Sequence, residues 1–192
     1  MPRSRAKASP RLCDRIVIAV TGSIAALWAG RFILHLRAEG YVREVSVIMS
    51  DHATEFVTPT AMRAIAGSPV MTSLFDVDAP FPVGHVQVTE GAGALIVMPA
   101  TANIIGKAAG GIADDAVSSS ILAAACPVIF VPNMNERMWR HPIVRRNVKT
   151  LKTAGYVVVP PESGVEVSTL RAREGAMASF EAIIAATRRA IR

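Results

Sequence analysis

The segment at residues 132–139, PNMNERMW, carries side chains that can bind a polar substrate. The amides of Asn133 and Asn135 offer hydrogen-bond donors and acceptors that can hold a carboxylate or a peptide backbone. Met134 and Met138 add adaptable apolar contact. The segment therefore predicts a loop that holds a peptide-like or carboxylate-bearing substrate over a flat cofactor.

Two other loops offer hydroxyl groups to a phosphate. In TGS at 21–23, Gly22 permits a tight turn, and Ser23 can cap a helix beside backbone N–H groups that suit a phosphate. The loop lacks the GxGxxG spacing of a dinucleotide site and the lysine of a P-loop, which favours a mononucleotide phosphate. On the motif alone, an ordinary helix cap is the favoured interpretation. Ser50 follows the next apolar run and is a second candidate for a phosphate or ribityl chain.

The PATAN segment at 99–103 is rich in small residues, which let a flat ligand approach the backbone. Thr101 and Asn103 supply polar contacts, although Thr101 serves equally well as the cap of a helix. Phe56 fits either the core or a wall that stacks on a ring. These residues are consistent with a site for a flat, partly polar ring.

His85, in PVGHVQV, can take or give a proton near neutral pH. On its residue type alone, a surface histidine with satisfied hydrogen bonds is the favoured interpretation. No pair among the four histidines has metal-ligand spacing, and GxSxG is absent, so neither a zinc site nor a Ser-His-Asp hydrolase is indicated.

The elements that position these loops alternate between apolar runs and helical segments. Because the runs are continuously apolar, they predict parallel strands covered by helices on both faces, in a doubly wound, Rossmann-like or flavodoxin-like α/β domain. Trp139 is expected to anchor the helix that follows PNMN in the core. Ligands of such sheets bind at the carboxyl ends of the strands, where all four loops converge. The strands are expected at 16–20, 45–49, 94–98, 127–131 and 156–160, and the helices at 23–39, 52–66, 102–109, 115–125, 135–153 with a break at Pro142, and 176–191.

The charge distribution argues against nucleic-acid binding. The net charge of +6 lies near the termini, since residues 16–150 carry ten basic and ten acidic side chains. Residues 1–14 are predicted to form a disordered basic arm, and residues 15–192 a single domain. The uncharged stretch at 16–30 is too short to span a membrane, and its strand–turn–helix pattern argues against a signal peptide.

The two cysteines do not form a disulfide framework. Cys126 is expected to pack as a small hydrophobe, and Cys13 to lie in the arm. Both fit a reducing, cytoplasmic location.

The chain resembles the flavin-dependent cysteine decarboxylases. That family includes phosphopantothenoylcysteine decarboxylase of coenzyme A biosynthesis and the peptidyl-cysteine decarboxylases that tailor lantibiotics and related peptides. The resemblance covers roughly residues 15–160, and PNMNERMW matches the family's PxMNxxMW element at every fixed position. The segments that carry it, in order, are GSIAA, MSDHATEFVTP, GHVQV, PATANIIGKAAGGIADD and PNMNERMWRHP.

The resemblance implies FMN as the cofactor and a homotrimer, often assembled into a dodecamer, with FMN at the subunit contact. It implies that His85 is the active-site base and that Asn135, with Asn133, Met134 and Met138, holds the substrate cysteine. No metal is implied. The residues implied to contact FMN are Gly22, Ser23, Ile24 and Ser50 toward the phosphate and ribityl end, and Phe56, Pro99, Thr101, Ala102 and Asn103 along the flavin.

One departure distinguishes between the subfamilies. Coenzyme A enzymes carry a cysteine in a flap that re-reduces the enethiol formed when the oxidised cysteine loses CO₂. In GVEVSTLRAREGAM at 164–177, Ser168 or Thr169 stands at that place, and a hydroxyl cannot do thiol redox chemistry. The sequence therefore predicts oxidative decarboxylation of the C-terminal cysteine of a ribosomal precursor peptide, which stops at the aminoenethiol.

Two alternatives stay open. The chain resembles phosphopantothenoylcysteine decarboxylases closely enough to be one with an unusual flap. In a different class, it resembles non-catalytic flavin-binding regulatory subunits, although those often have longer charged tails. Prenyltransferases of related fold lack the PxMN element.

Overall fold

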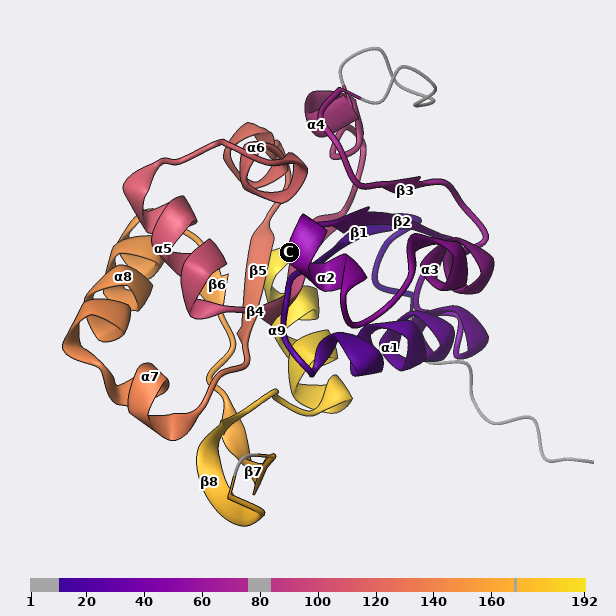
Figure 1. Ribbon diagram of the computed structural model, residues 1–192. Helices are drawn as coiled ribbons and strands as arrows, with labels where there is room; N and C mark the ends of the chain where they lie inside the picture. The colour runs from indigo at the N-terminus through magenta and orange to yellow at the C-terminus, as the bar shows by residue number, and fades with distance from the viewer. Residues whose placement is uncertain (1–10, 76–83, 168) are drawn as a thin grey trace, which may run out of the picture.

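The computed structural model describes residues 11–75, 84–167 and 169–192. Six parallel strands form one twisted sheet in the order β3-β2-β1-β4-β5-β6 (Figure 1). This arrangement confirms the predicted doubly wound α/β fold. The strands of this sheet are β1 (Arg15–Val20), β2 (Glu44–Met49), β3 (Val70–Met71), β4 (Ala94–Ala100), β5 (Val128–Pro132) and β6 (Val157–Val158).

Helices cover both faces of the sheet, because successive side chains of each strand point to opposite faces. Ile16 and Ile18 of β1 pack in one cluster with residues of α1, α3 and α9, whereas Val17 and Ala19 pack in the other with residues of α5, α6 and α8. The helices are α1 (Ala26–Ala38), α2 (Asp51–Thr54), α3 (Pro59–Ala66), α4 (Gly84–Gln87), α5 (Ala102–Gly110), α6 (Ala116–Ala123), α7 (Glu136–Arg140), α8 (Pro142–Thr153) and α9 (Phe180–Ala190). Among the described residues, no helix is both long and apolar enough to cross a membrane.

Proline and turn geometry set several helix boundaries. The expected break at Pro142 is confirmed, because α7 ends at Arg140 and α8 begins at Pro142. A second break, at Pro59, was not predicted; it divides the expected helix at 52–66 into α2 and α3. The first helix starts later than expected, at Ala26, because residues 23–25 form turns in which the amide of Ala26 donates to the carbonyl of Ser23.

A two-stranded antiparallel hairpin follows the sheet and was not predicted. It consists of β7 (Glu162–Glu166) and β8 (Arg171–Ala176), and it extends below the sheet in Figure 1. Most of its side chains are exposed or half-buried, so no apolar run marks it in the sequence. It also delays the start of α9 to Phe180, four residues later than expected.

The segment just before β1 packs against the domain, in contrast to the arm that was expected there. The amide of Leu12 donates to the carbonyl of Tyr41 at 2.8 Å, and Cys13 lies against Gly93. Burial raises the pKa of the Cys13 thiol, and it also raises that of Cys126, which packs against the second core cluster as expected. The rest of the predicted arm, residues 1–10, lies outside the described residues.

A polar cluster joins α5 to α6. Lys107 Nζ lies 2.7 Å from carboxylate oxygens of both Asp114 and Asp115, and Asp115 also accepts a hydrogen bond from the amide of Ser118 as the N-cap of α6. Burial acts to raise the pKa of Asp115, but the hydrogen bonds from Lys107 and Ser118 outweigh it and lower that pKa. Asp115 therefore stabilises the fold as a carboxylate.

We expect Asp115→Ala to lower the free energy of unfolding by about 1–2 kcal/mol at neutral pH, since it removes a helix cap and a charged hydrogen bond. Urea unfolding measures this. Because the folded-state pKa of Asp115 is lowered, its contribution is present above the ordinary value of 3.8 and is lost as pH falls through the folded-state pKa. The difference between variant and parent should shrink over that acidic range.

The control is Asp114→Ala. Asp114 contacts the same lysine, but its side chain is 56% exposed and does not cap α6, so its loss should cost less. An equal or larger loss at Asp114 would contradict the role assigned to the cap.

Candidate active site

A cavity of about 620 Å³ lies at the carboxyl ends of the parallel strands. Loops that follow β1, β2, β4 and β5 line it, which confirms the predicted convergence of the four loops. We call it the rim cavity. The predicted site residues that line it are Gly22, Ser23, Ser50, Thr101, Ala102, Asn103, Asn133, Met134 and Met138.

Thr21 fixes the first loop against the third. It is buried, and its hydroxyl donates to the carbonyl of Pro99 at 2.6 Å and accepts from the amide of Thr101 at 3.3 Å. Pro99, a predicted site residue, is itself buried and does not line the rim cavity. Within one chain, its carbonyl instead holds Thr21 and so helps to position the loops that line the cavity. Thr21 was not among the predicted site residues, although its place directly after β1 was a usable signal.

Gly22 is required by the close approach of two segments. A Cβ atom on Gly22 would lie 2.4 Å from the Cβ of His52 and 3.0 Å from its carbonyl oxygen. Any side chain at this position would therefore push the first loop and α2 apart. This close approach places Gly22 and His52 together in the wall of the rim cavity.

The first turn of α5 presents backbone donors to the rim cavity. Thr101 caps this helix, since its hydroxyl accepts from the amide of Ile104 at 3.3 Å, and Ala102 and Asn103 line the cavity beside it. The first N–H groups of a helix have no partner within the helix, and the helix dipole favours negative charge there. Thr101 therefore caps α5, as predicted, and it also lines the rim cavity.

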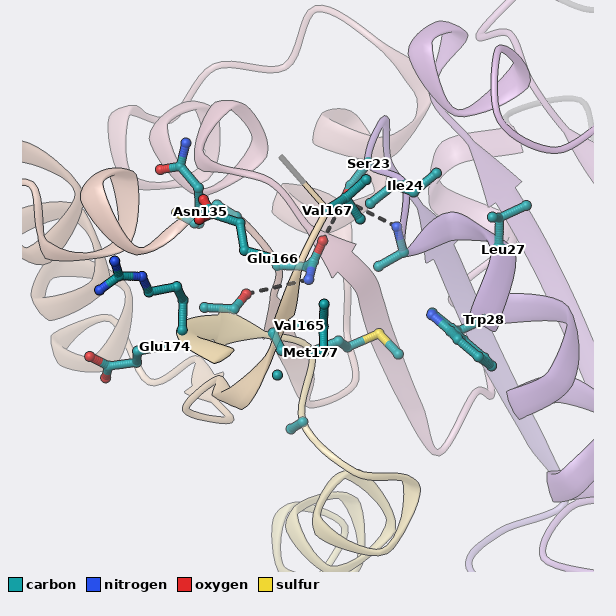
Figure 2. Close-up of a pocket in the computed structure, with 18 of the residues that line it drawn as sticks. Ser23, Ile24, Leu27, Trp28, Asn135, Val165, Glu166, Val167, Glu174 and Met177 are labelled. Carbon is teal, nitrogen blue, oxygen red and sulfur yellow. Dashed lines mark hydrogen bonds between the residues drawn. The ribbon is translucent and has the colours of Figure 1, made fainter. Parts of the chain in front are cut away.

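A second cavity, of about 820 Å³, lies between the start of α1 and the hairpin (Figure 2). Ile24, Leu27 and Trp28 line one side, and Val165 and Met177 lie on the other. We call it the hairpin cavity. Ile24 and Asn135, both predicted site residues, line this cavity instead of the rim cavity.

Asn133 lies between the two cavities and lines both. Its Oδ1 accepts from Ser23 Oγ at 2.5 Å, and its Nδ2 donates to the carbonyl of Gly175 at 3.3 Å. The amide of Met134 donates to the same carbonyl at 3.1 Å. The substrate loop predicted from the sequence is thus held by the first loop on one side and by the hairpin on the other.

Asn135 is the N-cap of α7. Its Oδ1 accepts from the amide of Met138 at 2.9 Å, which orients the side chain at the edge of the hairpin cavity. Trp139 is buried, as predicted, and it fixes α7 to the core.

Within one chain, His85 and Phe56 do not join the other predicted residues. His85 lies on α4 and lines a separate hollow of about 530 Å³ with Leu74, Phe75 and Leu122. None of the residues lining that hollow lines the rim cavity or the hairpin cavity. Phe56 lines none of these cavities, and at 40% exposure it is not a core residue.

Several residues of the rim cavity were not predicted. Asp51 and His52 follow Ser50 directly, and Lys107, Asp114 and Asp115 are the charged residues of the alanine- and glycine-rich segment after PATAN. Charged side chains in such a segment were a usable signal. The Lys107 ammonium is held by two carboxylates, so this wall of the cavity carries net negative charge.

The curated relatives include bifunctional coenzyme A biosynthesis proteins. The CoaBC protein of Bacillus subtilis (strain 168) is 38% identical over 149 residues, which are 78% of this chain and 36% of the relative. That of Escherichia coli (strain K12) is 37% identical over 150 residues, which are 78% and 36% of the two chains. This chain thus spans about a third of the length of these relatives.

Solved structures share the fold over nearly the whole chain. The FMN-dependent cysteine decarboxylase SpaF is 33% identical, with a TM-score of 0.81 and coverage of 93% of this chain and 98% of SpaF. A PPC decarboxylase variant in complex with pantothenoylaminoethenethiol is 26% identical, with a TM-score of 0.80 and coverage of 92% and 97%. The model of the flavoprotein family matches residues 5–192. The chain therefore belongs to the flavoprotein family, in the group that contains the flavin-dependent cysteine decarboxylases.

Proposed function

We propose that the protein is an FMN-dependent peptidyl-cysteine decarboxylase. It converts the C-terminal cysteine of a ribosomal precursor peptide to an aminoenethiol. Membership of the flavoprotein family and similarity to FMN-dependent cysteine decarboxylases support the cofactor and the class of reaction. The choice of a peptide substrate is our inference, and it rests on the hairpin.

The residues of the rim cavity fit FMN. Because position 22 is glycine, the first loop can pack directly against His52 and form one wall of the cavity; a side chain there would collide with His52. The Ser50 side chain does not cap α2, so its hydroxyl is available to a ligand, and the first turn of α5 offers backbone donors. Gly22, Ser23 and Ser50 would hold the phosphate and ribityl end, and Thr101, Ala102 and Asn103 the ring. When bound, the flavin supplies a two-electron acceptor.

Asn133 and Asn135 would hold the substrate cysteine and its carboxylate. An ordinary cysteine α-carboxylate loses CO₂ poorly, because the carbanion left behind has no electron sink. Oxidation of the side chain by two electrons converts CH₂–SH to a thioaldehyde, which accepts the electron pair as CO₂ leaves. His85 would take the thiol proton. The product is an enethiol, and the substrate has lost CO₂ and two hydrogen atoms.

The turn of the hairpin carries the observation that favours a peptide. By the resemblance, Ser168, which lies outside the described residues, or Thr169 stands where the coenzyme A enzymes carry a reducing cysteine. Thr169 Oγ1 donates to Glu166 Oε2 at 2.8 Å, within the turn itself. A similar solved structure is that of a PPC decarboxylase with a cysteine-to-serine substitution, in complex with pantothenoylaminoethenethiol. An enethiol bound to a protein that lacks one of its cysteines is consistent with a reaction that stops at the enethiol.

The lining of the hairpin cavity also favours a peptide. Its charged lining residues are Glu166, Arg173 and Glu174, of which Arg173 lies 3.4 Å from a carboxylate oxygen of Glu136 and Glu174 lies 3.1 Å from Arg140. Because Arg173 and Glu174 already have partners, the apolar wall of Leu27 and Trp28 is the main surface offered to a substrate, and it suits uncharged residues.

Phosphopantothenoylcysteine decarboxylase of coenzyme A biosynthesis is the second candidate. The sequence similarity to the CoaBC proteins supports this candidate as strongly as the similarity to SpaF supports the first candidate. The two candidates differ in substrate and in the final redox state of the product.

The isolation of His85 from Asn135 within one chain supports a site shared between copies. Phe75, which lines the His85 hollow, is 88% exposed, and Leu122 beside it is 41% exposed. Apolar side chains of this kind are typical of surfaces that another chain covers. We propose a homotrimer, assembled further into a dodecamer, in which His85 of one copy completes the site of the next.

We expect the flavin-loaded protein to remove CO₂ and two hydrogen atoms from short peptides that end in cysteine, as read by mass spectrometry. His85→Asn should lower the rate at least about 100-fold, the usual contribution of an acid–base group. His35→Asn is the control, because His35 lies outside both cavities, and it should retain the parent rate. Loss of CO₂ alone, or turnover of phosphopantothenoylcysteine only, would favour the second candidate. Unchanged turnover in His85→Asn would contradict the role of His85 as the base.

Co-expression of two inactive variants tests the shared site. If His85 and Asn135 of one site come from different copies, mixed oligomers of His85→Asn and Asn135→Ala should recover about a quarter of the parent rate, since random assembly leaves one pair in four intact. Each variant alone should stay inactive. No recovery in mixed oligomers would place both residues in one copy.

We expect Gly22→Ala to weaken FMN binding by about tenfold or more, because the new Cβ would displace the first loop from α2. Fluorescence titration of flavin into the flavin-free protein measures this. Gly106→Ala is the control, since a Cβ there has only an ordinary contact, 3.7 Å from Asn147. Equal affinities in the two variants would show that the Gly22 wall does not bind the cofactor.

A further inference from the structure

Glu174 of β8 is bonded to two consecutive residues of α7. Its Oε1 accepts from Trp139 Nε1 at 3.2 Å, and its Oε2 accepts from Arg140 Nε at 3.1 Å. Trp139 is only 4% exposed, so its indole N–H depends on this carboxylate for a hydrogen bond. One side chain of the hairpin therefore satisfies a nearly buried donor of the helix that follows the substrate loop.

The next residue, Gly175, joins the hairpin to the substrate loop itself. Its carbonyl accepts from Asn133 and from the amide of Met134, as described above. Gly175 has a φ of +119°, and a Cβ atom there would lie 2.1 Å from the carbonyl oxygen of Met134. The backbone of β8 thus lies directly on the loop, and Glu174 fixes it there from the neighbouring position.

The two hydrogen bonds of Glu174 are expected to contribute unequally to stability. The pair with Arg140 is a surface contact, since the arginine side chain is 65% exposed, and Arg140 has a second partner in Glu136 at 3.0 Å. The bond from Trp139 involves a donor that water scarcely reaches, so its loss leaves a buried N–H without a partner. The effect of Glu174 is therefore expected to act chiefly through Trp139.

We propose that Glu174 is a positioning residue that holds the hairpin against the Asn133–Asn135 loop and thereby keeps the hairpin cavity in shape. The hairpin supplies one wall of that cavity, and the loop supplies the amides that hold the substrate. Glu174 acts through Trp139 and α7 and leaves the reacting atoms to other residues. The consequence for substrate binding rests on the proposed function; the consequence for the hairpin does not.

The first test needs no substrate. In the flavin-loaded protein, trypsin cleavage after Arg171 in β8 should be about tenfold faster in Glu174→Ala than in the parent, since release of the hairpin lets its backbone open to the protease. Trp139→Phe, which keeps the ring and removes the donor, should reproduce most of this increase. Glu174→Gln should cause less, because its amide oxygen still accepts from Trp139.

Glu166→Gln is the matched control for cleavage. It removes a carboxylate from the same hairpin, but among the described residues that carboxylate bonds to Thr169 within the turn and not to α7, so cleavage should stay near the parent rate. Retained flavin in every variant shows that the domain is folded. Parent-like cleavage in both Glu174→Ala and Trp139→Phe would overturn the proposal.

The second test uses a peptide that ends in cysteine. Glu174→Ala should raise KM about tenfold and change kcat by less than about threefold, since the binding wall is loosened while the reacting groups are untouched. A fall in kcat at constant KM would overturn the positioning role. If the parent does not turn over the peptide, the proposed function fails, and the cleavage experiment still decides the role of Glu174.

Discussion

The rest of the site depends on the two hydrogen bonds of Asn133. They connect the loop after β1, through Ser23, to the carbonyl of Gly175 in the hairpin, across more than 150 residues of sequence. Because one amide has both a donor and an acceptor, it can hold two such segments at once. The same side chain lines both cavities, so the walls of the rim cavity and the hairpin cavity share a single support.

The two cavities differ in how firmly their walls are held. The rim cavity is built on the ends of parallel strands and on the first turn of α5, elements fixed by the core. The hairpin cavity has one wall on α1 and the other on exposed strands held by a few polar contacts. The rim cavity therefore has a constant geometry, whereas the outer wall of the hairpin cavity, held by fewer bonds, can open more easily.

The sequence predicted the features that leave a strong physical signal. The long strands were found because continuous apolar runs mark buried parallel strands, and the break at Pro142 because proline cannot continue a helix. The hairpin was missed because its exposed side chains have no apolar pattern. Thr21 and Asp115 were missed because their importance arises from contacts with Pro99 and Lys107, which only folding brings near. His85 was found by residue type, but its separation from Asn135 within one chain leaves no local pattern in the sequence.

The two ends of the hairpin are fastened to each other at its base. Glu162, the first residue of β7, accepts hydrogen bonds from the amide and the hydroxyl of Ser179, the residue just before α9. Phe180 follows at once and packs on Phe32 with ring centroids 5.0 Å apart. With its base closed and seated in the core, the hairpin cannot unzip from its ends or slide along the domain. Any movement that widens the hairpin cavity would then tilt β7 and β8 together about Glu162 and Ser179.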